Sequence, residues 1–320
     1  MLPSAEVIDI LDPIPGLVFA GEVDGRRTFA AWRDGAVRLL DDRLAEVAHR
    51  KLSLAGDARV LAASGLDLVV IAAAGGVTIV EDDEVDLLEL PADAAAIVNG
   101  LLVITAPENE VHRVLLLDRA TGAVLDEQTA QVDDARAALY PHPNDGTAVL
   151  EMALGQDGTL VYRVDVEESR LRLTAILEGD DPVIAGFSPS GDRLLVVDDP
   201  SALETVRALT WPGLDALSRV EADEVDAEYG FGLAGCWIDD DRVAFYATED
   251  SLIVATGDLG SPERVELPIA FGDDGEIESL TPLGRGGVAV GAWTPAGRLT
   301  LVVEFAEAEA TESLARTVRR

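Results

Sequence analysis

The sequence is poor in the residues from which most metal and nucleophile sites are built. It contains three histidines and one cysteine, Cys236. A single cysteine cannot form an intrachain disulfide, so a disulfide-stapled secreted domain is excluded. Zinc sites draw several ligands from histidine and cysteine, and here there is no H-x-x-x-H or C-x-x-C motif. The sequence therefore predicts no zinc centre, and we expect no cofactor.

Basic residues are also scarce. Lysine and arginine together number 24 against 60 aspartates and glutamates, which gives a formal net charge of −36, and Lys51 is the only lysine. Such a surface repels the phosphates of nucleic acids and the headgroups of anionic lipids. We therefore expect neither nucleic acid nor a membrane as partner. A protein or peptide of basic character, or a cation, is the expected partner.

Long hydrophobic runs are missing as well. The longest apolar stretch, residues 66–80, is interrupted by Asp67 and is shorter than the ~20 residues that span a bilayer. The first residues lack the basic and apolar regions of a secretory signal. We expect a cytoplasmic protein. Hydrophobic residues still make up 48% of the chain, which excludes an intrinsically disordered protein and is enough for a large core.

What the sequence does contain is a repeat. A polar turn followed by a strongly apolar run recurs seven times, at intervals of 35 to 49 residues that match the ~40–45 residues of a four-stranded propeller blade. The turns are marked by Gly25, Gly65, Gly100, Gly146, Gly191, Asp240 and Gly286. A second apolar run follows each first one, and then an amphipathic, more polar segment. Each unit thus reads as two very apolar inner strands, a third strand and an amphipathic edge strand.

The repeat predicts an all-β, seven-bladed β-propeller of four-stranded blades. The seventh unit ends after three strands, and the alternating segment Ala5–Leu11 precedes the first unit. We expect this N-terminal strand to complete blade seven and so close the ring. Residues 1–308 would then form one domain, and residues 309–320, which are rich in helix formers, a C-terminal tail or short helix.

Three of the units resemble a known group of propellers. Residues 187–197, FSPSGDRLLVV, resemble the F-S-P-D-G element of bacterial WD-repeat-like and TolB-like propellers, and residues 140–150, YPHPNDGTAVL, resemble the same element. Residues 115–127, LLLDRATGAVLDE, are similar to the D-x-x-T-G-x-V hairpin of these propellers. The resemblance implies the scaffold and no particular activity, since one fold hosts many functions.

Candidate binding residues come from two loops. The acidic connection at residues 219–235 carries Tyr229 and Phe231 among glycines, and exposed aromatics beside charge are common in partner sites. In the other interpretation, these two residues simply begin the next inner strand. Tyr140 and His142 flank the Pro-His-Pro turn, where His142 either contacts a ligand or serves as a turn residue. No catalytic or metal-ligating residue is predicted.

Two classes of function remain open beside a non-enzymatic interaction scaffold. Acidic clusters occur at residues 81–86, 178–182, 239–242 and 272–278. These could bind Ca²⁺ through oxygen ligands, and a Ca²⁺-dependent hydrolase or lyase with carboxylates in the central channel is the first alternative. The clusters lack the D-x-D-x-D-G spacing of a calcium loop, and this favours the interpretation of the clusters as ordinary solvated turns. A sensor that binds a small ligand in the channel is the second alternative.

Overall fold

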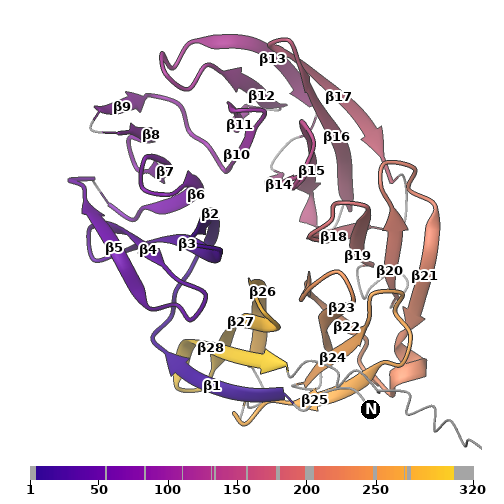
Figure 1. Cartoon of the computed structure of the whole chain (residues 1–320). Helices are drawn as coiled ribbons and strands as arrows, with labels where there is room; N and C mark the ends of the chain where they lie inside the picture. Colours follow the sequence, from indigo (N-terminus) through magenta and orange to yellow (C-terminus); the bar gives the residue numbers. More distant parts are fainter. Residues whose placement is uncertain are drawn as a thin grey trace, which may run out of the picture.

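Seven separate sheets, each with four antiparallel strands, make up the part of the chain that the structure describes. The structure is a computed structural model and describes residues 5–54, 56–82, 84–109, 111–130, 132, 135–155, 158–177, 181–198, 205–247, 251–269, 271 and 275–305. The sheets stand around a common axis like blades (Figure 1). The sequence prediction of a seven-bladed, all-β propeller is confirmed.

Six blades use four consecutive strands each, numbered here from the channel outward. Blade 1 consists of β2 (Val18–Val23), β3 (Arg26–Arg33), β4 (Ala36–Leu40) and β5 (Glu46–Lys51); blade 2 of β6 (Arg59–Ser64), β7 (Leu68–Ala73), β8 (Gly76–Glu81) and β9 (Glu84–Leu88). Blade 3 consists of β10 (Ala94–Val98), β11 (Leu101–Glu108), β12 (Val111–Leu117) and β13 (Val124–Ala130); blade 4 of β14 (Arg136–Pro141), β15 (Thr147–Ala153), β16 (Thr159–Glu167) and β17 (Arg170–Ile176). Blade 5 consists of β18 (Pro182–Phe187), β19 (Arg193–Asp198), β20 (Thr205–Thr210) and β21 (Ala216–Glu221); blade 6 of β22 (Phe231–Trp237), β23 (Arg242–Ala247), β24 (Ser251–Thr256) and β25 (Glu263–Glu266).

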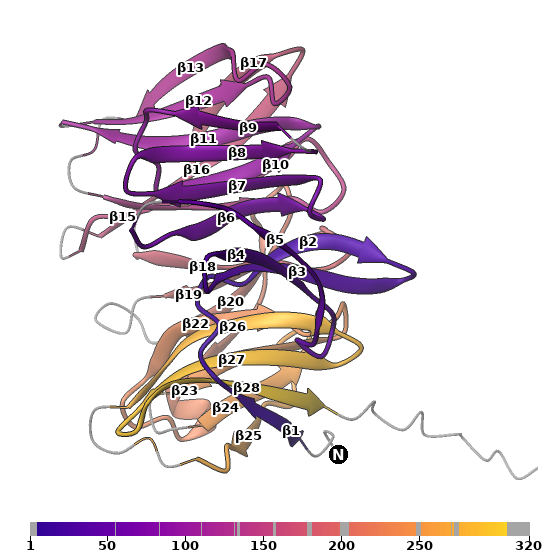
Figure 2. The same cartoon turned by 90° about the vertical axis from the view of Figure 1, so that its left-hand side faces the viewer.

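Blade 7 joins the two ends of the described chain. Its inner strands are β26 (Glu276–Gly284), β27 (Gly287–Thr294) and β28 (Gly297–Phe305), and its outer strand is β1 (Ala5–Leu11), which pairs antiparallel with β28. Figure 2 shows β1 lying against β28. The N-terminal strand therefore covers an edge that β28 would otherwise expose, as the alternating segment predicted. The predicted tail at 309–320 lies outside the described residues.

The connections between strands alternate between the two faces of the ring, because neighbouring strands in a blade are antiparallel. We call the hairpin face the one that carries the turns from first to second and from third to fourth strand. The opposite, crossover face carries the second-to-third turns and the connections to the next blade. All seven turn positions that mark the repeat in the sequence belong to the hairpin face.

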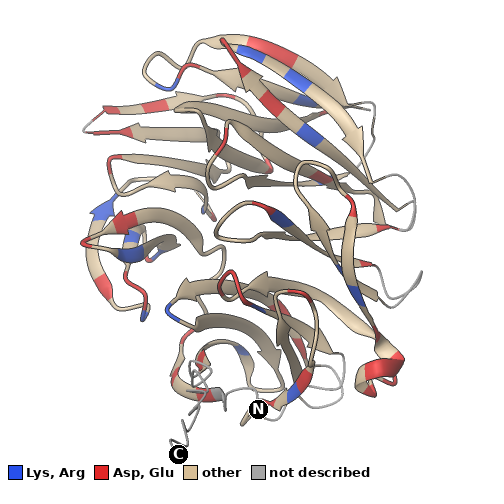
Figure 3. Cartoon of the chain, turned by 45° about the vertical axis from the view of Figure 1, so that its right-hand side comes forward, with Lys and Arg blue, Asp and Glu red and all other residues tan. Residues whose placement is uncertain are grey.

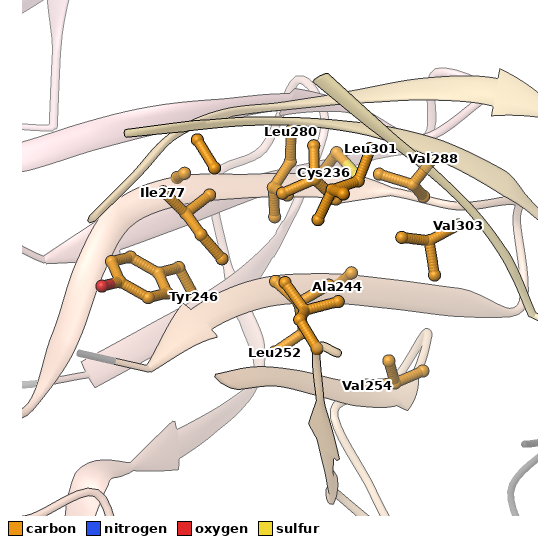
Figure 4. Packing of buried hydrophobic residues seen from close by; sticks show 14 of the residues in the cluster. Cys236, Ala244, Tyr246, Leu252, Val254, Ile277, Leu280, Val288, Leu301 and Val303 are labelled. Carbon is orange, nitrogen blue, oxygen red and sulfur yellow. The ribbon is translucent and has the colours of Figure 1, made fainter. Parts of the chain in front are cut away.

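The core is divided into seven apolar clusters, and each lies between two neighbouring blades. Figure 4 shows the one between blades 6 and 7, where Tyr246 and Leu252 face Ile277, Leu280 and Leu301. One blade is too thin to bury either of its own faces. Packing against both neighbours removes these faces from water, which is the main favourable contribution to folding.

The order of strands within a blade differs from the prediction. The two most apolar runs form the second and third strands, as in β23, whose six residues are all buried. The innermost strands are partly exposed; β14 has no fully buried residue. Blades converge toward the axis, so their first strands have the least room and take small residues, for example three consecutive alanines in β10. The sequence interpretation had placed the strongest apolar runs at the centre.

Candidate functional site

The four predicted binding residues do not form one site. Tyr140 and His142 lie at the hairpin-face end of β14 and in the turn that follows it, within blade 4. Tyr229 and Phe231 lie at the end of the connection from blade 5 to blade 6, on the crossover face. The topology therefore places the two pairs on opposite faces of the ring, and each pair is described separately.

Tyr140 contributes to the packing between blades 4 and 5. Its side chain packs against the apolar cluster of these blades, and its hydroxyl lies 3.5 Å from Oε2 of Glu151 on β15. The same Oε2 accepts a hydrogen bond from the Ile184 N–H of blade 5 at 2.6 Å. Burial raises the pKa of Tyr140 well above its ordinary value and raises the pKa of Glu151 to about 7. Glu151 is therefore a buried carboxyl that joins two blades.

His142 holds the turns of blades 4 and 5 together. Its side chain is 7% exposed. The ring nitrogen Nδ1 accepts hydrogen bonds from the backbone N–H groups of Asn144 and Asp145, at 3.2 and 2.9 Å, so Nε2 is the nitrogen that donates to Gly191 O, at 2.8 Å. The ring also packs edge-on against Phe187. Each nitrogen is occupied within the protein, which is the arrangement of a turn residue and leaves no ring nitrogen for a ligand.

Phe231 is buried and Tyr229 is exposed, although only one residue separates them. Phe231 begins β22, is 0% exposed and packs edge-on against Phe245 with ring centroids 5.1 Å apart. Tyr229 is 69% exposed, the highest value among the large apolar and aromatic side chains found exposed in the described residues. The interpretation as the start of an inner strand thus describes Phe231. Tyr229 is the residue that reaches the surface.

The connection that carries Tyr229, residues 221–230, is called the acidic loop below. It begins with a short 3₁₀ turn, η2 (Ala222–Val225), which Figure 3 shows in red at the rim of the molecule. Four of its carboxylate side chains are exposed: Asp223, Glu224, Asp226 and Glu228. The same ten-residue loop therefore carries four exposed carboxylates and one exposed aromatic ring, that of Tyr229.

Local hydrogen bonds and buried anchors hold the acidic loop in place. Ala222 and Ala227 are buried in the cluster between blades 5 and 6, and the N–H of Ala227 donates to Ala222 O at 3.0 Å. Asp226 adopts a left-handed conformation (φ 54°) that reverses the chain between them. From β25, Nη2 of Arg264 donates to the carbonyl of Asp226 at 2.8 Å. These contacts give the acidic loop a fixed conformation within the protein itself.

Blade 3 contains a buried polar network that the sequence did not predict. Asp93 accepts a hydrogen bond from the Thr105 hydroxyl at 2.5 Å, and its second oxygen lies 3.1 Å from His112 Nε2 and from the Ala137 N–H of blade 4. Aspartate, histidine and a hydroxyl are the groups of a catalytic triad. Here Thr105 and His112 are 0% and 2% exposed, and the hydroxyl contacts the aspartate rather than the imidazole. The network ties blade 3 to blade 4, and its hydroxyl and imidazole are buried in the protein.

The acidic clusters do not assemble into a metal centre in the described residues. Asp239 pairs with Arg242 at 2.6 Å, and Asp240 accepts the Ser190 N–H at 2.8 Å. Glu278 pairs with Arg298 at 2.7 Å. Parts of the clusters at 81–86, 178–182 and 272–278 lie outside the described residues. Within the described ranges, no three histidine, cysteine or acidic side chains come together as a possible metal site.

Two further observations concern the single cysteine and membrane-spanning helices. Burial raises the pKa of the Cys236 thiol to about 12, so this cysteine stays protonated and unreactive at neutral pH. Among the described residues, no helix is long and apolar enough to span a membrane.

Comparisons with known proteins show the fold. No protein-family model matches the chain, and no curated protein matches it by sequence. Among solved structures, it is similar to the WD40 β-propeller domain of Doa1, with a TM-score of 0.58 and 12% identity over 96% of this chain and 98% of that one. It is similar to the C-terminal WD40 domain of Sif2, with a TM-score of 0.57 and 12% identity over 94% and 99% of the two chains.

A third similar structure contains a partner protein. This is BBS1N in complex with ARL6DN, with a TM-score of 0.57 and 15% identity over 96% of this chain and 97% of that one. At these identities the likeness shows the fold alone, a β-propeller like that of the WD40 domains. The fold implied by the resemblance to WD-repeat-like propellers is thus confirmed, and the resemblance to TolB-like propellers stays a prediction.

Proposed function

We propose that this protein is a non-enzymatic interaction module whose acidic loop binds a basic segment of a partner protein. The observation that carries the proposal is Tyr229, which is 69% exposed on an ordered loop that also carries four exposed carboxylates. Of the four residues predicted from the sequence, Tyr229 would contact the partner. Phe231 anchors the end of the loop in the apolar cluster between blades 5 and 6, and Tyr140 and His142 belong to the contacts between blades 4 and 5.

The order of the acidic loop favours binding. A flexible loop loses conformational entropy when a partner orders it, and this loss weakens the complex. Here buried Ala222 and Ala227, together with the bond from Arg264 to Asp226, fix the loop in the unbound protein. The Tyr229 ring is thus presented at little additional entropic cost.

The chemistry of the acidic loop suits arginine and lysine. A cation over a tyrosine ring is attracted by about 0.5–1 kcal/mol at an exposed site. The carboxylates of Asp223, Glu224 and Glu228 add Coulomb attraction, which steers a basic segment to the surface and fixes its orientation. The net charge of −36 extends this attraction beyond the loop at low ionic strength.

The comparison with BBS1N is compatible with a protein partner, since BBS1N was solved in complex with ARL6DN. A WD40-type ring offers a rigid frame on which loops of any sequence can be displayed. The acidic loop is such a displayed segment, and its negative charge favours a partner segment that is rich in arginine or lysine.

Fluorescence anisotropy with a labelled arginine-rich peptide tests the proposal. We expect saturable binding that weakens as NaCl is raised, because exposed charges are screened. Tyr229→Ala should weaken binding about fivefold, which corresponds to about 1 kcal/mol of cation–π attraction. The triple change Asp223→Asn, Glu224→Gln, Glu228→Gln should weaken it further.

Two matched controls separate the acidic loop from the general charge of the protein. Trp293→Ala removes another exposed aromatic, 45% exposed, on β27 of blade 7. Glu84→Gln with Asp86→Asn removes exposed carboxylates from β9 of blade 2. Both controls should bind like the wild type. Equal losses in the controls and in the loop variants would refute the proposed site.

A further inference from the structure

The hairpin face carries arginine side chains that reach from one blade to the next. Arg193 is the first residue of β19 in blade 5, and its guanidinium donates to the carbonyls of Gly257, at 3.1 Å, and of Asp240, both in blade 6. Arg242 is the first residue of β23 in blade 6, and it donates to the Phe305 carbonyl of blade 7 at 3.3 Å. The same strand position thus connects two successive pairs of blades.

The corresponding residue of blade 7 is Gly287, so this connection to blade 1 is missing. The register supports the equivalence. Arg193 pairs with Thr210 and Arg242 with Thr256, each the last residue of the third strand, and Gly287 pairs with Glu304, one residue before the end of the third strand. A Cβ atom at Gly287 would lie 3.2 Å from Gly284 O, closer than ordinary contact. The tight turn of blade 7 therefore favours glycine, and the space that an arginine would fill is left open.

A cavity of about 220 Å³ lies at this position, between blades 7 and 1. Its charged lining residues are Arg26, Asp42, Arg43, Arg285 and Glu304. Acidic residues outnumber basic ones 60 to 24 in the whole chain, whereas here three arginines meet two carboxylates. This cavity, called the seam pocket below, thus has the opposite charge balance to the rest of the protein.

Two of the three arginines in the seam pocket have no partner within the described part of the protein. Nε of Arg285 lies 3.8 Å from Oδ2 of Asp42, a loose ion pair. The guanidinium groups of Arg26 and Arg43 form no hydrogen bond or ion pair with any described residue. Nearly all other arginines in the described ranges contact a carboxylate, a carbonyl or an aromatic ring; Arg136 is the exception.

We infer that the seam pocket binds a small phosphate-type oxyanion between Arg26 and Arg43. Guanidinium groups present paired N–H donors that match the oxygens of phosphate, and these charge-assisted hydrogen bonds are strong. Asp42 and Glu304 in the same lining repel any anion, so binding requires contact with both arginines at once. A tetrahedral phosphate has enough oxygens to accept from both guanidinium groups, whereas acetate has only two. The pocket lies on the hairpin face and the acidic loop on the crossover face, so this site is independent of the proposed function.

Isothermal titration calorimetry of the full chain tests the inference at low ionic strength. Inorganic phosphate, pyrophosphate and acetate are titrated separately, with NaCl of equal ionic strength as a blank. We expect saturable one-site binding of phosphate or pyrophosphate and none of acetate. If pyrophosphate binds more tightly than phosphate, the natural ligand carries a diphosphate. If the two bind with equal affinity, the pocket binds a single phosphate group.

Arginine variants locate the binding. Arg26→Gln with Arg43→Gln should weaken binding at least tenfold, because both charge-assisted contacts are lost. Arg136→Gln, which removes the unpartnered arginine of blade 4, should bind like the wild type. The exposed single variant Arg43→Gln serves if the double variant is unstable, and it should also weaken binding. The inference is overturned if the wild type shows no saturable binding, or if the Arg43 and Arg136 variants bind equally.

Discussion

Glu151→Gln replaces a carboxyl group that the fold buries between blades 4 and 5. In the native protein, Oε2 of Glu151 accepts the Ile184 N–H at 2.6 Å and lies 3.5 Å from the Tyr140 hydroxyl. The glutamine oxygen can accept the same N–H, so the substitution keeps the shape and the main contact. What it removes is the ability to carry a negative charge in a buried place.

The size of the effect follows from the pKa of this group. Burial raises the pKa of Glu151 from 4.5 to about 7. Each unit corresponds to 1.36 kcal/mol, so ionisation of Glu151 destabilises the native state by about 3 kcal/mol. Between pH 4.5 and 7 the native state keeps a proton that the unfolded chain loses. The free energy of unfolding therefore falls as the pH rises through this range.

The assay is chemical unfolding of the two proteins from pH 4.5 to 8.5. The other carboxylates affect both proteins alike, so the difference between them isolates Glu151. We expect no difference at pH 4.5 and a variant more stable by about 3 kcal/mol at pH 8. Glu127→Gln is the matched control: its bond to Arg113 lowers the pKa of Glu127, so its substitution should not stabilise the protein at high pH. A wild-type-to-variant difference that stays flat over the whole range would refute the reasoning.

Three other predictions concern stability. Gly191→Ala should lower the free energy of unfolding by about 2–3 kcal/mol, because φ is +80° and the new Cβ would lie 2.4 Å from His142 Nε2. Gly25→Ala is the control in the same denaturant titration. Its φ is +73° but no atom lies within 4 Å of the new Cβ, so it should lower the free energy of unfolding by only about 1 kcal/mol. Asp93→Ala should cost about 2–4 kcal/mol, since it leaves buried donors of blades 3 and 4 unpaired, and an unchanged melting temperature would contradict this role. Removal of residues 1–11 should expose the edge of β28 and produce aggregates in size-exclusion chromatography, whereas a stable monomer would contradict closure by β1.

The sequence was sufficient to predict the architecture because the repeat is a direct consequence of the packing. Every blade needs apolar second and third strands, so residues such as those of β23 recur at the blade period whatever their exact identity. Closure was also predictable, since β28 ends the seventh unit one strand short and Ala5–Leu11 alternates as an outer strand should. The small residues of the first strands have a geometric cause, the narrowing of the ring, which periodicity alone does not express.

The functional surfaces were harder to predict because they depend on which way single side chains point. Tyr229 and Phe231 lie two positions apart in the same glycine-containing segment, yet one is exposed and the other is in the core. His142 resembles a ligand-binding histidine until its partners Asn144 and Gly191 are known. The sequence of the His142 turn does not reveal which turn of the next blade lies beside it. The Gly191 carbonyl of that neighbouring turn decides the role of the histidine.

The seam pocket had no signal in the linear sequence. Arg26 and Arg43 belong to the first blade and Arg285 to the last, and ring closure brings them together. Gly287 leaves the space open, but nothing in the neighbouring sequence distinguishes it from the other glycines in turns. Only the comparison with Arg193 and Arg242 in three dimensions identifies what is missing there.

Amide hydrogen exchange with and without an arginine-rich peptide tests the proposed function most directly, since it reports contact at each segment of the native protein. The account predicts added protection at residues 221–230 around Tyr229, and a smaller effect of the peptide in the Tyr229→Ala variant. Protection confined to the channel strands or to the hairpin face, with the acidic loop unchanged, would contradict it.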